Sequence, residues 1–184
     1  MGKVMLNILV TLDGFIDHTV MIADDEAVDY ATELLNSVDA MLFGRVTYQL
    51  LGDYWPTAAS DPSLSRSNLE FARKINSMPK FVISRTLTKV EWNNTRLVKG
   101  DLVEEVTRLK QSSDRGLLIA GSVLNNTLMQ HDLIDEYRLL INPVLLGTGK
   151  PLFREDLPRI PLKLVEARTF RSGIVLVRYL PDRK

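Results

Sequence analysis

Residues 39–55 read DAMLFGRVTYQLLGDYW and join a short apolar run to a charged turn. The run Ala40–Phe43 is typical of a strand buried on both faces, and Gly44 and Arg45 end it abruptly. Helical spacing begins at Val46, so this stretch predicts a strand, a tight turn and a helix. An arginine in such a turn is either a solvated surface residue or a group placed to meet an anion.

The composition of the chain excludes several classes of function. Its 184 residues, 45% of them hydrophobic, can bury a core of their own, and the length predicts a single domain over 1–184. The 23 basic residues balance the 23 acidic residues, which argues against binding to nucleic acid or to an anionic membrane surface. Without cysteine, the chain has no disulfide, no thiolate metal site and no cysteine nucleophile.

Two further absences shape the expectations. The only histidines are His18 and His131, far apart in the chain, so we expect no metal centre. No apolar run approaches the ~20 residues of a membrane-spanning helix, and the N-terminal stretch is unlike a signal peptide. We therefore expect a soluble, cytoplasmic protein.

Strand and helix patterns alternate along the first two thirds of the chain. The patterns predict strands at 3–12, 40–43, 80–84, 116–121, 136–146, 162–170 and 174–180, and helices at 24–38, 46–51, 67–76, 101–111 and 122–131. Residues 56–67 are expected to form a surface loop or lid, and residues 171–173 a hairpin turn. The alternation predicts a three-layer α/β fold with a mostly parallel sheet and an antiparallel hairpin at its C-terminal end.

Three expected strands end in small residues, hydroxyls or arginines that suit an anion. These endings are Gly44-Arg45-Val46-Thr47, Ser84-Arg85-Thr86 and Ala120-Gly121-Ser122. In an open α/β sheet, ligands bind outside the carboxyl ends of the strands, where helix N-termini offer free N–H groups. Each turn alone is weak evidence, but together they form the row of sites that a dinucleotide with several phosphates requires.

These segments also carry a family resemblance. LFGRVTYQLL, FVISRTL, IAGSVLNNTLM and above all LIDEYRLLINPVLLGTGKPLF (133–153) resemble the dihydrofolate reductase-like family. Within it, the chain is most similar to the branch that holds the reductase domain of bifunctional riboflavin-biosynthesis deaminase-reductases and its stand-alone relatives. The resemblance runs from the first strand to the closing hairpin, and it implies a three-layer α/β/α fold of the dihydrofolate reductase type.

The resemblance implies NADPH as the hydride donor. It places the phosphates of the cofactor on the turns at Gly44, Ser84 and Gly121, and the segment Leu12-Asp13-Gly14 over the nicotinamide. The complete set implied for the cofactor is Leu12, Asp13, Gly14, Gly44, Arg45, Val46, Thr47, Ser84, Arg85, Thr86, Gly121, Ser122, Val123 and Leu124. Two guanidinium groups beside a ribose would favour NADPH over NADH, because the extra phosphate suits their donor geometry.

The substrate side is less defined. Tyr48, Trp55, Gly147 and Thr148 are expected at the substrate pocket, although the two aromatic residues suit a packed core equally well. Asp29 lies nearest to the acidic residue that dihydrofolate reductases carry on their first helix, but a solvated first turn explains it too. Lys150, Arg154 and Asp13 could meet a phosphorylated pyrimidine substrate.

The leading hypothesis is an NADPH-dependent reductase that resembles 5-amino-6-(5-phosphoribosylamino)uracil reductase of riboflavin biosynthesis. The alternatives are a true dihydrofolate reductase and a dinucleotide-binding module without catalysis. By analogy with the family, the apolar strand 137–146 suggests a homodimer.

Overall fold

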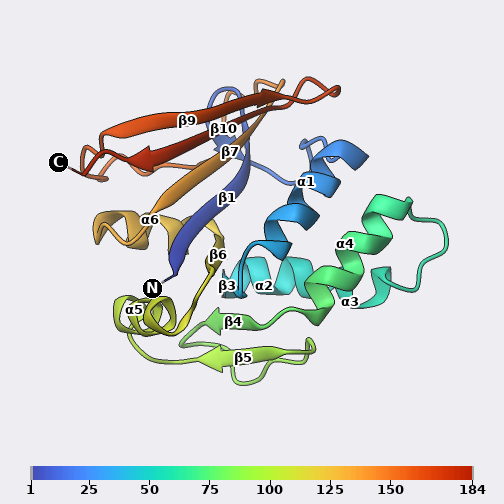
Figure 1. Ribbon diagram of the computed structural model, residues 1–184, viewed down its shortest axis with the longest axis horizontal. Helices are drawn as coiled ribbons and strands as arrows, with labels where there is room; N and C mark the ends of the chain where they lie inside the picture. The colour runs from blue at the N-terminus through green and yellow to red at the C-terminus, as the bar shows by residue number, and fades with distance from the viewer. Residues whose placement is uncertain (1, 184) are drawn as a thin grey trace.

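The computed structural model describes residues 2–183, in which helices cover both faces of one large sheet (Figure 1). The strand order in this sheet is β5-β4-β3-β6-β1-β7-β10-β9. Its strands are β1 (Lys3–Thr11), β3 (Ala40–Gly44), β4 (Lys80–Ile83), β5 (Thr95–Val98), β6 (Gly116–Ala120), β7 (Glu136–Asn142), β9 (Leu162–Thr169) and β10 (Val175–Pro181). A second small sheet pairs β2 (Phe15–Ile16) with β8 (Lys150–Pro151).

The first six strands in this order run parallel, and β10 is antiparallel to both β7 and β9. β1 lies inside the sheet, where Leu6 is in register with Ile119 of β6 and with Tyr137 of β7. Because helices cover both faces there, β1 and β3 are apolar on both sides, as parallel strands usually are. The mostly parallel sheet with an antiparallel C-terminal hairpin is therefore confirmed.

The helices are α1 (Asp25–Asn36), α2 (Arg45–Gly52), α3 (Trp55–Ala58), α4 (Arg66–Ser77), α5 (Leu102–Ser112) and α6 (Ser122–Gln130). Three of the six helices in the described part of the chain, α1, α4 and α5, begin where a short polar side chain accepts from free N–H groups. Asp24 Oδ1 accepts from Ala27 N at 2.9 Å, and Asp101 Oδ1 accepts from Val103 N at 2.9 Å, so Asp24 and Asp101 are the N-caps of α1 and α5. Within residues 2–183, no helix has the length and apolarity needed to cross a membrane.

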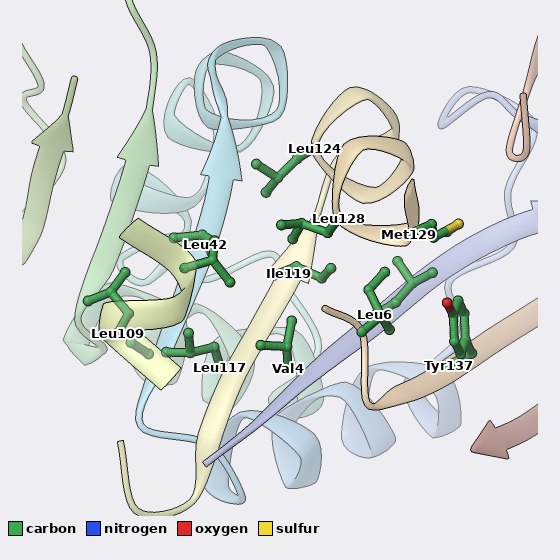
Figure 2. Close-up of a cluster of buried hydrophobic side chains, with 13 residues drawn as sticks. Val4, Leu6, Leu42, Leu109, Leu117, Ile119, Leu124, Leu128, Met129 and Tyr137 are labelled. Carbon is green, nitrogen blue, oxygen red and sulfur yellow. The ribbon is translucent and has the colours of Figure 1, made fainter. Parts of the chain in front are cut away.

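Each face of the sheet carries its own apolar core. On one face, α5 and α6 bring Leu109, Leu124 and Leu128 against Leu6 and Ile119 of the sheet (Figure 2). On the other face, α1, α2 and α4 pack on the sheet in a cluster that includes Leu34, Phe43, Tyr48, Ile75, Val82 and Trp92. These two cores leave the carboxyl ends of the parallel strands at the rim of the sheet, where the connecting turns emerge.

The structure corrects several boundaries. β5 was not predicted, because Thr95–Val98 is short and carries a charged residue in its middle. The expected loop 56–67 begins with the short helix α3, and α4 starts at Arg66, capped by Ser65. The strand expected over 136–146 ends at Asn142, directly before Pro143, whose ring removes a ladder donor.

Candidate functional site

The turn after β3 and the turn after β6 touch each other at the carboxyl edge of the sheet. A Cβ atom on Gly121 would lie only 2.7 Å from Thr47 Oγ1, and Gly121 has a φ of +122°. Both the backbone conformation and the lack of space for a side chain therefore require glycine at position 121. The glycine lets the start of α6 approach the start of α2, so two helix N-termini share one edge.

Both of these helices begin without a side-chain cap. Gly44 is the N-cap of α2 and Gly121 is the N-cap of α6, and neither offers a side-chain acceptor. By contrast, α1, α4 and α5 have side-chain caps from Asp24, Ser65 and Asp101. The first N–H groups of α2 and α6 are thus available to a ligand, and the positive end of each helix dipole favours an anion there.

Three cations stand at the ends of three neighbouring strands. Arg45 follows β3, and the one hydrogen bond of its side chain within residues 2–183 goes from Nη1 to Gln49 Oε1 at 3.3 Å. Arg85 follows β4, and Lys99 follows β5 directly beside it, because Ser84 N donates to Val98 O at 3.1 Å. All three side chains are exposed, and none forms an ion pair with a described carboxylate.

Lys99 was missed by the sequence reading because its strand was missed. Once β5 is recognised, its last residue Val98 is in register with Ile83, the last residue of β4, so Lys99 lies level with Ser84 and one position before Arg85. The signal was the run Leu97-Val98-Lys99-Gly100, an apolar pair followed by a cation and a glycine. The row Arg45–Arg85–Lys99 gives this end of the edge a local positive charge in a protein of zero net charge.

The hydroxyl of Ser84 organises its own turn. Ser84 Oγ accepts from Thr86 N at 3.2 Å and from Leu87 N at 3.1 Å. The side chain is buried, whereas the neighbouring Arg85 and Thr86 are exposed. The turn after β4 therefore presents Arg85 and Thr86 outward, and Ser84 fixes their backbone.

Exposed apolar side chains lie along the same edge. Val46 and Val123, in the first turns of α2 and α6, are 63% and 72% exposed. Leu12 after β1 and Leu145 after β7 are 64% and 70% exposed. Apolar side chains at a sheet edge beside free N–H groups suit a ligand that combines flat rings with phosphates. Gly14 and Ser122 also lie in these turns, and Leu124 points into the core of Figure 2.

A carboxylate joins the turn after β1 to the loop after β7. Asp13 Oδ2 accepts from Gly147 N at 2.7 Å, and both of its oxygens accept from Leu146 N at 3.2 and 3.1 Å. Thr11 Oγ1 donates to Asp13 Oδ1 at 2.6 Å. These bonds, led by that of Thr11, hold the pKa of Asp13 below its usual value. Gly147 and Thr148 are exposed in the loop that Asp13 holds.

The two aromatic residues expected at the substrate pocket both pack against the apolar core. Tyr48 is 9% exposed, and its hydroxyl accepts from Glu91 N at 2.9 Å and from Trp92 N at 3.3 Å. Trp55 stacks edge to face on Phe71, with ring centroids 4.6 Å apart. Both residues belong to the core between the sheet and α2, α3 and α4, which is the second of the two roles that the sequence allowed.

Asp29 does not lie with the strand-end turns. It is exposed on α1 and lines a groove between α1 and α4 together with Glu33, Arg66 and Glu70. No residue that lines this groove belongs to a strand-end turn. Arg154 is likewise engaged, because its guanidinium donates to both carboxylate oxygens of Asp156 at 2.9 and 2.6 Å. Within residues 2–183, no three His, Asp or Glu side chains gather as a metal site would require.

The chain has a fold of the dihydrofolate reductase-like class. Its features are a mostly parallel sheet, an antiparallel hairpin at the C-terminal end, and free N–H groups beside the carboxyl ends of the strands. Residues 2–176 match the family described as the RibD C-terminal domain. The chain belongs to this family, whose members include reductase domains of riboflavin biosynthesis.

Two proteins of Bacillus subtilis (strain 168) resemble the chain over nearly its full length. It is 36% identical to the uncharacterized protein YyaP over 186 residues, covering 96% of this chain and 94% of YyaP. It is 25% identical to the uncharacterized protein YwjB, covering 95% of each chain.

Solved structures show the same fold. A putative riboflavin biosynthesis protein from Shewanella sp. PV-4 superposes with a TM-score of 0.76 at 25% identity, covering 100% of both chains. A diaminohydroxyphosphoribosylaminopyrimidine deaminase/5-amino-6-(5-phosphoribosylamino)uracil reductase from Thermotoga maritima superposes with a TM-score of 0.67 at 19% identity. That match covers 98% of this chain and 56% of the Thermotoga chain.

Proposed function

We propose that this protein is an NADPH-dependent reductase that transfers hydride to a small heterocyclic or sugar-imine substrate. The reaction resembles that of 5-amino-6-(5-phosphoribosylamino)uracil reductase in riboflavin biosynthesis. The observation that carries the proposal is the pair of uncapped helix N-termini at Gly44 and Gly121, brought together by the close contact of Gly121 with Thr47.

The residues present at this edge fit such a cofactor. A Cβ atom on Gly44 would meet no atom within 4 Å, although its φ of −82° is open to any residue. Glycine is thus not required there by the backbone, and the open space beside the first N–H groups of α2 suits a phosphate. The guanidinium groups of Arg45 and Arg85, which form no ion pair within residues 2–183, would supply charge-assisted donors that favour NADPH over NADH.

NADPH supplies the hydride when it is bound, and the protein supplies binding and orientation. The N–H groups at the starts of α2 and α6 would hold the phosphates, and Arg45 and Arg85, with Lys99 beside them, would neutralise the 2′-phosphate. Val46, Val123, Leu12 and Leu145 would cover the flat rings and exclude water from them. No step is assigned to Asp29, because its carboxylate lies in the groove between α1 and α4.

A thermal-shift titration with NADPH, NADH and 2′,5′-ADP tests the proposal. A ligand that binds only the folded state at a hundredfold excess over its Kd should stabilise the protein by about 2.7 kcal/mol. Arg45→Ala should weaken NADPH by roughly 10- to 150-fold, since a charge-assisted contact is worth about 1.5–3 kcal/mol, and should change NADH by less than about twofold. Arg73→Ala, an exposed arginine on α4, is the matched control and should change neither.

The outcomes separate the alternatives. A folded wild-type protein that shows no shift with either NADPH or 2′,5′-ADP contradicts the cofactor assignment. Binding without oxidation of NADPH by any pyrimidine, pteridine or flavin acceptor supports the non-catalytic module, and reduction of dihydrofolate with antifolate sensitivity supports a true dihydrofolate reductase. Equal losses of NADPH and NADH in Arg45→Ala would show that Arg45 does not meet the 2′-phosphate.

The proposal includes assembly as a homodimer, but not through the strand 137–146 that the sequence suggested, because that strand is β7 and is paired on both sides by β1 and β10. β9 is an edge strand of the large sheet, and it exposes Leu162, Leu164 and Val165. Exposed apolar side chains on an edge strand favour association with another chain. Light scattering coupled to gel filtration should give the mass of two chains, and the mass of one chain would reject this part.

A further inference from the structure

The loop after β7 is joined to the turn after β1 by several hydrogen bonds, and the side chain of Asp13 accepts from two of the N–H donors. Leu12 N donates to Val144 O at 3.0 Å, and Leu152 N donates to Gly14 O at 2.9 Å. Between these two backbone bonds, the Asp13 carboxylate accepts from Leu146 N and Gly147 N. The pairing of β2 with β8 continues the same junction.

The Asp13 carboxylate is already engaged by the protein's own donors, which favours a positioning role. Its two oxygens already accept from the hydroxyl of Thr11 and from two backbone N–H groups. These donors lower the pKa of Asp13 and keep it ionised at neutral pH. Thr11 is fixed in turn, because it is 1% exposed and its Oγ1 also accepts from Phe15 N at 2.8 Å.

The bonds of Asp13 set the position of two apolar side chains. Leu12 precedes Asp13, and Leu145 precedes the two residues whose N–H groups Asp13 holds. Both leucines are largely exposed, so they contribute little to the core and are available to a ligand. Exposed loop residues keep a defined position only where polar contacts fix their backbone, and Asp13 provides such contacts on both sides.

We propose that Asp13 is a positioning residue of the reductase, whose carboxylate joins the two loops so that Leu12 and Leu145 receive the hydride-transferring end of the cofactor. This inference rests on the proposed function. It assigns Asp13 to the loop 145–149 and not to the substrate, in contrast to the direct contact that the sequence suggested. The adenosine end of the cofactor, at Arg45 and Arg85, is independent of Asp13.

The variant Asp13→Asn tests the inference, because an asparagine amide offers one acceptor oxygen and turns an NH₂ group towards the N–H donors. We expect the Kd for NADPH to rise about tenfold, since two hydrogen bonds to a charged group are lost. The Kd for 2′,5′-ADP, which lacks the nicotinamide, should change less than twofold. Hydrogen exchange at residues 145–149 should become faster in the same variant.

Asp17→Asn is the matched control. Among residues 2–183, Asp17 Oδ1 accepts from Thr19 alone, from its N at 2.9 Å and its Oγ1 at 2.7 Å, so these bonds stay within one local turn. This variant should leave both affinities and the exchange of 145–149 unchanged. A general loss of stability would alter both ligands together, so the selective loss of NADPH separates positioning from a merely structural role.

Each outcome decides the matter. If the wild-type protein binds neither NADPH nor 2′,5′-ADP, the proposed function fails. If it binds both and Asp13→Asn binds NADPH equally well, only the role of Asp13 is overturned. If circular dichroism shows that Asp13→Asn is unfolded, Leu145→Ala carries the test, because an exposed side chain can be truncated without unfolding the protein. Unchanged NADPH affinity in Leu145→Ala would then overturn the inference.

Discussion

The contact between the two turns predicts a large loss of stability in Gly121→Ala. The new Cβ would lie 2.7 Å from Thr47 Oγ1, and the residue would keep a φ of +122° that L side chains rarely adopt. Backbone strain of this kind costs about 1–3 kcal/mol, and an overpacked contact costs about as much again. We expect the free energy of unfolding to fall by about 3 kcal/mol, or roughly 6–12 °C in Tm for a domain of this size.

The measurement is urea unfolding followed by circular dichroism, with calorimetry for Tm, and Gly44→Ala is the control. Gly44 has a φ of −82° and open space around its missing Cβ, so the control should change the unfolding free energy by less than about 1 kcal/mol. Its methyl group would instead enter the proposed phosphate site and weaken NADPH. If Gly121→Ala unfolds within about 0.5 kcal/mol of the wild-type protein, the two turns do not touch as described.

Three further predictions concern buried or bonded polar groups. The hydrogen bond from Ser113 is the main cause that holds the pKa of Asp39 well below its usual value, so the stability that ionised Asp39 contributes is present above pH 3.8 and is lost in acid. Asp39→Asn should lower the free energy of unfolding in urea by about 2 kcal/mol at pH 7, and the gap between variant and wild type should shrink at low pH. Burial lowers the pKa of Lys80 to about 8, so the unfolded chain binds more protons between pH 8 and 10.5, and urea titrations should show the wild type gaining stability relative to Lys80→Met as pH rises through this window. Asn125 is fully buried and both of its side-chain polar atoms lack a described partner, so Asn125→Leu should have a Tm equal to or above that of the wild type, and a lower Tm would contradict this account. Asn126→Leu removes the bonds to Ser122 O and Arg154 N and should lower the Tm.

Much of the sheet could be predicted because its strands are apolar on both faces. The run Ala40–Phe43 is wholly buried in the structure, and the helices at 101–111 and 122–131 were found within a residue or two of α5 and α6. β5 was not predicted, because Arg96 interrupts its short apolar pattern. This edge strand forms through its pairing with β4, and that pairing is not visible in its own residues. Local sequence patterns indicate which residues are buried, so a short edge strand with few buried residues is hard to predict.

The candidate site was predicted in part. The turns at Gly44, Ser84 and Gly121 do lie at successive strand ends, as the alternation of strands and helices required. Tyr48 and Asp29 could not be placed from the sequence, because the side of a helix that faces a pocket is set by neighbours far along the chain. The ring of Tyr48 packs in the apolar cluster with Phe43 and Trp92, and its hydroxyl accepts from Glu91 N and Trp92 N.

The sequence by itself determined the class of fold and the residue types at the strand ends, because hydrophobic periodicity and glycine positions are local properties. The tertiary structure decided which of those ends meet. Only parallel pairing in the order β5-β4-β3-β6-β1-β7 brings Lys99, Arg85 and Arg45 onto neighbouring strands. Only the folded chain shows that Gly121 closes on Thr47 and that Asp13 holds Gly147, since these contacts join residues separated by 74 and 134 positions.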